Sequence, residues 1–465
     1  MKKVLFIFLL PIIGICQNPN YSEDIAPIIY GKCLQCHYNG GIAPLTLETY
    51  SSTVSNAGII QHVTSNGEMP PWPPDTLFRR YSFENTLSFD EINTITDWIT
   101  NGVPLGDTLL LPPLPTFTNS SSLGLADLEL QIPNYISTAS ANSDDYVCFS
   151  IPTGLVQDKK IRAIEVIPGN LQAVHHVLVS IDPFPNNSVV TTPNCMGPQG
   201  DLIYSYAPGA LPLVYPNLVN NTFGVELTAN SSISLNMHYP EGSAGQLDST
   251  KVKFYFYSQN TVIREISNDF LINEGLFGVP FILPPNQITE ITGSFGPTTQ
   301  DYSFMSVFPH MHLLGSDIEC VAITPTNDTI NLIRINNWDF EWQGDYYFEK
   351  FIKIPAGSII YAKGHYDNTI SSTNPNPLSV QSGFNTEDEM FICIFQFLPY
   401  QIGDENISID DGSISTNINN LNTNHTSKAL LKITNSFGQS INPISNTPMF
   451  FIYDNGTVEK KIILE

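Results

Sequence analysis

The sequence predicts a multidomain, mainly β protein: a small all-α domain, two all-β sandwich subdomains of the jelly-roll type, and a short β-rich module at the C-terminus. Three observations predict this order. Helical apolar spacing is confined to residues 17–106, short apolar runs between Asn, Pro, Gly, Ser and Thr clusters fill residues 125–402, and polar stretches separate the parts. The 465 residues, 42% of them hydrophobic, are enough for several cores.

The first 18 residues, MKKVLFIFLLPIIGICQN, place two lysines before a short apolar run. This pattern predicts a secretory signal over residues 1–16, cleaved near Cys16. A lipid anchor on Cys16 is the alternative, although Ile15 is a poor residue to precede one. No later stretch has 18 uninterrupted apolar residues, so we expect no transmembrane segment in the mature chain. The protein should be secreted or lie at the cell surface.

Charge excludes two classes of partner. The chain has 19 Lys and Arg against 44 Asp and Glu, which gives a formal net charge of −25. Nucleic acid needs a basic face on its protein partner, and so does an anionic membrane. We therefore expect no nucleic-acid partner and no docking on anionic lipid.

Residues 17–106 contain two segments with helical apolar spacing, IAPIIYGKC and SFDEINTITDWITNG. In the second segment, Ser88 suits the N-cap and Gly102 follows the end of the helix. A Pro-rich stretch then predicts a linker over residues 107–124.

Residues 125–402 are expected to form the two sandwiches, 125–267 and 268–402, because the region is large for a single one. A second linker, rich in Asp, Asn and Ser, is expected over 403–424, and the short β-rich module over 425–465.

The motif Cys33-Leu34-Gln35-Cys36-His37 has the C-x-x-C-H spacing that attaches haem c. Two thiols add to the haem vinyl groups, and His37 is placed to ligate the iron. The chance alternative is a plain cysteine pair. Met69, in a proline-rich loop, is expected as the second axial ligand, with His62 as its rival and a five-coordinate iron as the remaining alternative. Residues 17–106 thus read as a cytochrome c-like domain with one covalently bound haem.

Four other cysteines follow the motif, an even number in an exported chain. They can form up to two disulfides, with three possible connectivities. We favour Cys148 with Cys195 and Cys320 with Cys393, one bond within each sandwich.

His310 and His312 in FPHMHLLG share one face if the segment is a strand. Met390, in NTEDEM, could complete a soft site with two nitrogens and one sulfur. Thioether ligands favour Cu(I), and imidazole suits copper in either redox state. The sequence therefore predicts a copper site.

His175 and His176 are adjacent, so in a regular strand they would face opposite sides. Both can bind one ion only at a bulge, a strand end or a strong twist. His238, in SISLNMHYP, could supply a third nitrogen. Three histidines hold zinc as readily as copper, and a single sandwich histidine is more often a satisfied core residue.

The order of these motifs resembles the copper type II, ascorbate-dependent monooxygenases, which include peptidylglycine α-hydroxylating monooxygenase and dopamine β-monooxygenase. The resemblance covers residues 140–400 and rests on VHHVLVS, LNMHYP, FPHMHLLG, GHYDNT and GFNTEDEM. It implies two sandwiches that face each other across solvent, each with one copper ion. His175, His176 and His238 would hold the copper that stores and supplies an electron. The copper on the other three ligands, His310, His312 and Met390, would bind oxygen and substrate.

Two departures from the family bear on the substrate. Phe308 stands where the peptide hydroxylase has an arginine for the peptide carboxylate, and Ile394 stands where it has a tyrosine. A glycine-extended peptide or a catecholamine is therefore not expected, and the two residues suggest an apolar substrate surface or simply core. His365 is interpreted as structural or as support for a ligand, and Asp388 and Glu389 as a solvated or turn feature instead of a general base.

The tail resembles the C-terminal sorting domain of the bacterial type IX secretion system in its LLKITNSFG start and FFIYDNGTVEKKIILE finish. The resemblance implies the type IX machinery as a partner and export across the outer membrane. The alternative is a small structural hairpin module.

Together, these features predict a secreted copper monooxygenase that hydroxylates a C–H bond of a small organic substrate with O₂. Electrons from an ascorbate-like reductant or a redox protein would enter through the haem. One alternative is a non-catalytic copper and haem protein for electron transfer or copper binding. Another is a surface-displayed binding module without metal.

Overall fold

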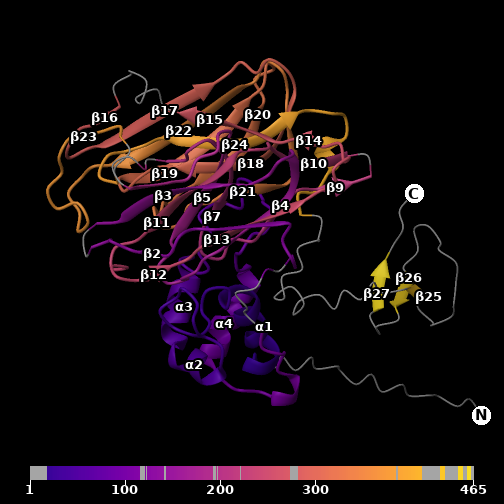
Figure 1. The fold of residues 1–465 in the computed structure, drawn as a ribbon. Helices are drawn as coiled ribbons and strands as arrows, with labels where there is room; N and C mark the ends of the chain where they lie inside the picture. Colours follow the sequence, from indigo (N-terminus) through magenta and orange to yellow (C-terminus); the bar gives the residue numbers. More distant parts are fainter. Residues whose placement is uncertain are drawn as a thin grey trace, which may run out of the picture.

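The fold is given by a computed structural model, which shows a mostly β protein with a helical region at its N-terminal end (Figure 1). The structure describes residues 18–115, 121, 123–140, 143–191, 195, 197–219, 221–272, 281–383 and 386–410, and the strand backbones of 430–434, 449–453 and 458–461. The predicted signal segment, Cys16 and most of the predicted tail lie outside these residues. Among the described residues, no helix is long and apolar enough to cross a membrane.

The helical region has its own apolar core around Tyr21, Ile29 and Trp98. Its elements are η1 (Tyr21–Ile25), α1 (Ala26–Ile28), η2 (Ile29–Cys33), α2 (Tyr50–Ser55), α3 (Ala57–Ser65), α4 (Phe89–Thr100) and η3 (Thr108–Leu110).

Helix α4 begins and ends where the sequence predicts. The hydroxyl of Ser88 accepts the Glu91 N–H at 3.2 Å, and the Glu91 carboxylate accepts the Ser88 N–H at 2.7 Å. Gly102, just past the helix, takes a φ of +84°.

The helical region is not an independent all-α domain. Between α3 and α4 the chain leaves the helices and crosses the second sandwich, in a segment (residues 70–85) that we name the strap. Pro74 bridges to Ile335 and Tyr81 bridges to Phe348. Tyr81 is 3% exposed and belongs to the core of the second sandwich, where its hydroxyl donates to the Leu332 carbonyl at 2.8 Å. Part of the predicted 17–106 domain is therefore built into the second sandwich.

The first sandwich packs a five-stranded sheet on a larger one, with hydrophobic residues of both sheets in one cluster. The five-stranded sheet has the order β6 (Ser188–Thr191), β3 (Asp145–Pro152), β11 (Ser232–Tyr239), β5 (His176–Asp182) and β7 (Asp201–Tyr206). The larger sheet has the order β1 (Leu128–Gln131), β13 (Lys251–Phe256), β4 (Lys159–Ile167), β10 (Asn221–Leu227) and β14 (Arg264–Glu265), with β8 (Leu213–Val214) on β4 and β9 (Asn217–Leu218) on β10. A small pair, β2 (Tyr135–Ile136) and β12 (Leu247–Asp248), lies beside them.

The second sandwich has two four-stranded antiparallel sheets around a separate cluster. One sheet has the order β15 (Ser267–Ile272), β24 (Ile392–Pro399), β18 (Tyr302–His310) and β21 (Tyr346–Ile354). The other has the order β17 (Ile288–Phe295), β22 (Ile359–Asp367), β19 (Gly315–Ile323) and β20 (Thr329–Ile335). Further elements are the pair β16 (Ile282–Leu283) and β23 (Val380–Gln381), a turn η5 (Asp404–Asn406), and, in the tail, an antiparallel sheet of β25 (Leu430–Thr434), β26 (Met449–Tyr453) and β27 (Val458–Lys461).

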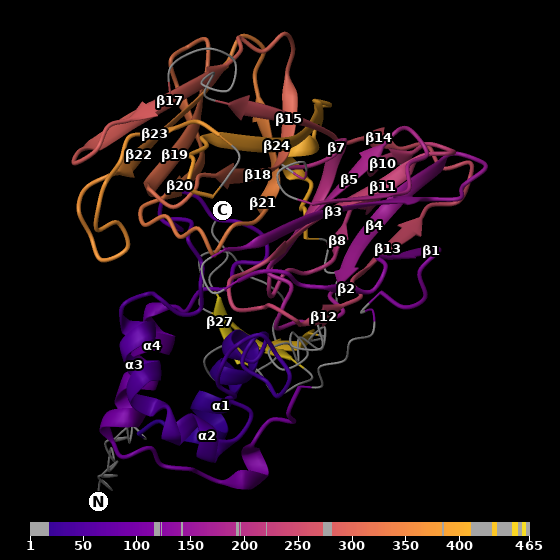
Figure 2. The same cartoon turned by 60° about the vertical axis from the view of Figure 1, so that its left-hand side comes forward.

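The chain passes from the first sandwich to the second at residue 266, because β14 pairs with β10 and β15 pairs with β24. Figure 2 shows β5 and β7 of the first sandwich beside β18 and β24 of the second. The two candidate metal clusters lie at this junction.

One of the two favoured disulfides is present. Cys148 and Cys195 are bonded, whereas Cys320 and Cys393 are free and buried. The prediction of a Cys320–Cys393 bond is therefore wrong for this structure. The two residues lie on β19 and β24 in different sheets, where burial and the neighbouring Cys393 thiol raise the pKa of Cys320, so the thiols are close to each other but not bonded.

Candidate metal centres

The first cluster forms where β5 begins. His176 is the first residue of β5, His175 precedes it, and His238 on β11 lies opposite His176 in the ladder. The His175 N–H donates to the His238 carbonyl at 3.0 Å. The adjacent histidines therefore reach one point because they sit at a strand end, which is one of the geometries that the sequence allowed.

The Nδ1 atoms of the three imidazoles converge on one point. Nδ1 of His175 is 3.2 Å from Nδ1 of His176 and 3.3 Å from Nδ1 of His238. The Nδ1 atoms of His176 and His238 are 3.1 Å apart. A triangle of this size accepts one ion at about 2.0–2.1 Å from each nitrogen, the usual length of a metal–imidazole bond. The donor set and its spacing fit copper or zinc.

Two carboxylates contact the opposite side of these rings. Asp144 Oδ2 is 3.1 Å from Nε2 of His238, and Glu341 Oε2 is 3.0 Å from Nε2 of His175. These contacts favour a proton on Nε2 and leave the Nδ1 lone pair for an ion. Tyr146 stacks on His238 with ring centroids 4.5 Å apart and an interplanar angle of 3°. Glu341 belongs to the second sandwich, so this contact crosses the junction.

Burial favours the neutral form of His176 and His238. It lowers the pKa of His176 well below its ordinary value, and the neighbouring His238, His175 and His310 lower it further. Burial also lowers the pKa of His238, although Asp144 opposes that shift. Neutral imidazole is the form that binds a metal.

The second cluster forms where β18 ends. His310 closes the strand and His312 lies just past it, with ring centroids 5.0 Å apart. Nδ1 of His310 donates to Gln343 Oε1 at 2.6 Å, and Nδ1 of His312 donates to the Asp388 carbonyl at 3.0 Å. Because Nδ1 of each ring contacts an oxygen, Nε2 is the candidate ligand atom of each ring. Burial and the neighbouring His312 lower the pKa of His310 to about 3.

Glu389 joins the methionine segment to the histidine turn. Its carboxylate accepts the N–H of His312 at 2.9 Å and the N–H of Leu314 at 2.6 Å. The residue is 1% exposed, and burial raises its pKa to about 8. The solvated interpretation of Glu389 is therefore wrong, because its oxygens take the place of water as acceptors for buried backbone N–H groups. Met390 follows directly and is 8% exposed.

Met390 packs in a small apolar cluster that spans both sandwiches. The other members are Leu202 from β7, Phe308 from β18, and Ile392 and Ile394 from β24. The two residues that depart from the family pattern are therefore buried at the junction. The sandwiches contact each other directly beside both metal clusters, instead of being separated there only by solvent as the resemblance implied.

His365 contacts neither cluster through its hydrogen bonds and ion pairs. Its Nδ1 is 2.8 Å from Asp317 Oδ1 and its Nε2 is 3.3 Å from Glu290 Oε2. Both partners lie on neighbouring strands of the same sheet, so the residue has the structural role that was one of its two interpretations.

The haem motif begins where the first helical segment ends at Cys33. The thiols of Cys33 and Cys36 are free, and burial raises their pKa values to about 12 and about 11. Nδ1 of His37 donates to the Leu45 carbonyl at 3.0 Å, which leaves Nε2 for iron. Two free thiols beside a histidine oriented in this way fit a haem c.

The two candidates for the second axial ligand differ in setting. Met69 precedes a cis peptide bond to Pro70 at the start of the strap, and its N–H donates to the Val63 carbonyl at 3.2 Å. His62 lies on α3, where its Nε2 is 3.3 Å from Nδ2 of Asn66 in an exposed contact. His62 thus already has a surface partner.

Residues 280–419 match the family model of the copper type II ascorbate-dependent monooxygenase, C-terminal domain. The match includes His310, His312 and Met390. The first cluster and the haem motif lie outside it. No curated protein matches the chain.

Solved structures that resemble the chain do so only distantly. The VP2 subviral particle of infectious bursal disease virus has 10% identity, covers 61% of this chain and 74% of its own, and has a TM-score of 0.15. A putative secreted protein from Parabacteroides distasonis has 11% identity, 59% and 89% coverage, and a TM-score of 0.15. The insecticidal δ-endotoxin Cry8Ea1 from Bacillus thuringiensis has 10% identity, 76% and 66% coverage, and a TM-score of 0.15.

Sequence reasoning missed four residues that hold the candidate ligands: Asp144, Glu341, Gln343 and Glu389. Glu389 precedes Met390 in an acidic run that reads as solvated. Glu341 and Gln343 lie between β20 and β21 in a segment with no motif, so only the fold reveals them.

Proposed function

We propose that this protein is a copper-dependent monooxygenase that hydroxylates a C–H bond of a small organic substrate with O₂. The observation that carries the proposal is the convergence of three Nδ1 atoms within 3.1–3.3 Å in the first sandwich. The family match over residues 280–419 supports it independently, because it covers the second cluster.

In this proposal His175, His176 and His238 hold one copper ion, and His310, His312 and Met390 hold the other. The reaction consumes O₂ and two external electrons, and two one-electron ions supply that pair. The protein contributes orientation: Asp144 and Glu341 hold two rings of the first cluster, while Gln343 and the Asp388 carbonyl hold the rings of the second. Met390 supplies a thioether, which favours Cu(I).

The haem and the secretion route belong to the same proposal. Cys33 and Cys36 would attach one haem c, with His37 and Met69 as axial ligands, and an ascorbate-like reductant or redox protein would reduce it. A thioether ligand raises the haem potential and suits electron transfer. A signal peptide and a type IX sorting tail would carry the protein to the cell surface or beyond.

The first experiment is elemental analysis of purified, copper-reconstituted protein, followed by a substrate screen under ¹⁸O₂. We expect two copper ions per haem and ¹⁸O in the product. His238→Ala and Met390→Ile should each remove one copper ion and abolish hydroxylation. His365→Ala and Met305→Ile are the matched controls and should retain both ions; Met305 is also fully buried on β18. Zinc alone, or full activity in Met390→Ile, would contradict the proposal.

The packing around Met390 favours a second candidate, a non-catalytic copper and haem protein for electron transfer. Met390, Phe308 and Ile394 are all at most 8% exposed, and an electron-transfer centre needs no access for substrate. Copper and haem redox activity without incorporation of ¹⁸O would support this function instead.

A further inference from the structure

The haem motif lies against the first sandwich. At Gly209, a Cβ atom would be 3.7 Å from Sγ of Cys36 and 3.7 Å from Oε1 of Gln35. Gly209 is in the turn that follows β7, where the Ala210 N–H donates to the Ala207 carbonyl at 2.8 Å. The second haem-attaching sulfur is thus in contact range of the end of β7.

The end of β7 lies beside the first histidine cluster. Tyr206, the last residue of β7, is opposite Val177 on β5, and Val177 follows His176 directly. Tyr206 is 6% exposed, and burial together with the nearby Cys36 raises its pKa. One residue of β7 is therefore close both to the motif and to the strand that carries His176.

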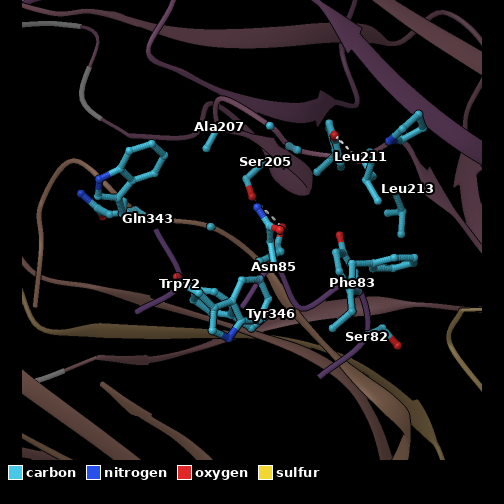
Figure 3. A pocket seen from close by; sticks show the side chains of 18 of the residues that line it. Trp72, Ser82, Phe83, Asn85, Ser205, Ala207, Leu211, Leu213, Gln343 and Tyr346 are labelled. Carbon is cyan, nitrogen blue, oxygen red and sulfur yellow. Dashed lines mark hydrogen bonds between the residues drawn. The ribbon is translucent and has the colours of Figure 1, made fainter. Parts of the chain in front are cut away.

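A cavity of about 180 Å³ is lined by residues of the motif, the strap and both sandwiches at this point (Figure 3). Gln35 from the motif, Asn85 from the strap, Ser205 and Ala207 from the first sandwich, and Gln343 from the second line it. Nδ2 of Asn85 donates to the Lys32 carbonyl at 3.2 Å, which joins the strap to the helical turn before Cys33. The motif is thereby joined to the strap and lies in contact range of the first sandwich.

We infer that a haem attached at Cys33 and Cys36 passes its electrons to the ion held by His175, His176 and His238, by way of Tyr206 and the β7–β5 pair. The inference rests on the proposed function. An external one-electron reductant would reduce the haem iron. Each transfer would then oxidise that iron by one electron and reduce the ion held by His175, His176 and His238 by one electron, so two transfers would be needed per turnover.

A path to the second cluster would use side-chain hydrogen bonds instead of a strand ladder. It would cross from Ser205 to Asp345 through a hydrogen bond of 2.7 Å, run along the chain to Gln343, and cross to His310 through another of 2.6 Å. The path to the first cluster needs one step across the β7–β5 ladder and one step along the chain to His176.

The test is rapid mixing of the full-length protein, anaerobic, with its haem reduced against Cu(II). Haem oxidation is followed by absorbance and copper reduction by loss of the Cu(II) electron paramagnetic resonance signal. We expect the fast phase of haem oxidation to vanish in His238→Ala and to persist in Met390→Ile. Persistence at the wild-type rate in His238→Ala, or loss only in Met390→Ile, would overturn the inference.

The route is tested by Tyr206→Leu, which we expect to slow the fast phase by at least about tenfold. Tyr206→Phe keeps the ring and should stay near the wild-type rate. Tyr215→Leu is the matched control, because Tyr215 is buried in the same core cluster but lies off the β5–β7 pair. Equal rates in Tyr206→Leu and wild type would exclude this route. Haem absorbance and copper content, measured first, separate this outcome from failure of the proposed function, in which haem or copper is missing from the wild type.

Discussion

The two candidate metal clusters differ in what holds their ligands in place. In the first cluster, His176 and His238 face each other in a continuous ladder, so the sheet itself fixes two of the three rings. In the second, β18 ends at His310, and His312 and Met390 lie outside regular strands. A single buried carboxylate, that of Glu389, joins these two segments.

The first cluster therefore forms together with its sheet, whereas the second depends on the buried side chain of Glu389. Backbone ladders form cooperatively with the core, but a loop held by one side chain loses its geometry when that side chain is lost. A substitution of Glu389 should therefore impair metal binding at the second cluster, whereas binding at the first should depend mainly on its ligands.

The largest effect is expected from Glu389→Ala. The substitution leaves the buried N–H groups of His312 and Leu314 without an acceptor, so it should lower the free energy of unfolding by about 3 kcal/mol. It should also release copper from the second cluster and leave the first loaded. Urea denaturation and copper titration measure the two effects.

Glu389→Gln should lie between wild type and Glu389→Ala, because the amide keeps one acceptor oxygen. Glu387→Ala is the matched control, since Glu387 is exposed two residues away. If Glu389→Ala behaved like Glu387→Ala, the second cluster would not depend on this anchor, and the contrast between the clusters would disappear.

The carboxylates behind the first cluster give the next largest effect. Asp144→Asn should weaken copper binding there by about 10–100-fold, as is typical of groups that orient a metal-binding histidine. Glu341→Gln should change it by no more than about fivefold, because the Glu341 side chain is 59% exposed and that of Asp144 is 17% exposed. Competition titration with a copper chelator gives both dissociation constants. A larger effect at Glu341 would mean that the first cluster is also held from outside its own sandwich.

Much of this arrangement can be predicted from the sequence, and the missing part has a physical cause. The alternating runs predict a mostly β fold, and the cap at Ser88 places α4. The adjacent His175 and His176 required a bulge, a strand end or a strong twist, and the structure has the strand end, because β5 begins at His176. Packing between distant segments leaves no local pattern, so neither the strap over the second sandwich nor the reach of Glu341 across the junction could be predicted. The burial of Glu389 could not be predicted for a similar reason, because its partners are backbone N–H groups, which leave no pattern in the sequence.

The smallest effect concerns Asp345, on the segment that brings Glu341 to the first cluster and Gln343 to the second. Ser205 donates to its carboxylate at 2.7 Å, and burial raises the Asp345 pKa from its ordinary value near 3.8 to about 6. The folded protein therefore holds a proton that the unfolded chain releases. This contribution to stability is complete below pH 3.8 and is lost as the pH rises through about 6. Between pH 4 and pH 7, the free energy of unfolding of the metal-free wild type should fall by about 1–2 kcal/mol relative to that of Asp345→Asn, whose amide does not titrate. Thermal unfolding of both proteins over this range measures the difference, and the other titrating groups cancel in the comparison. A constant difference would mean that Asp345 is ionised throughout, and that the segment shared by the two clusters is held by its backbone instead of by this contact.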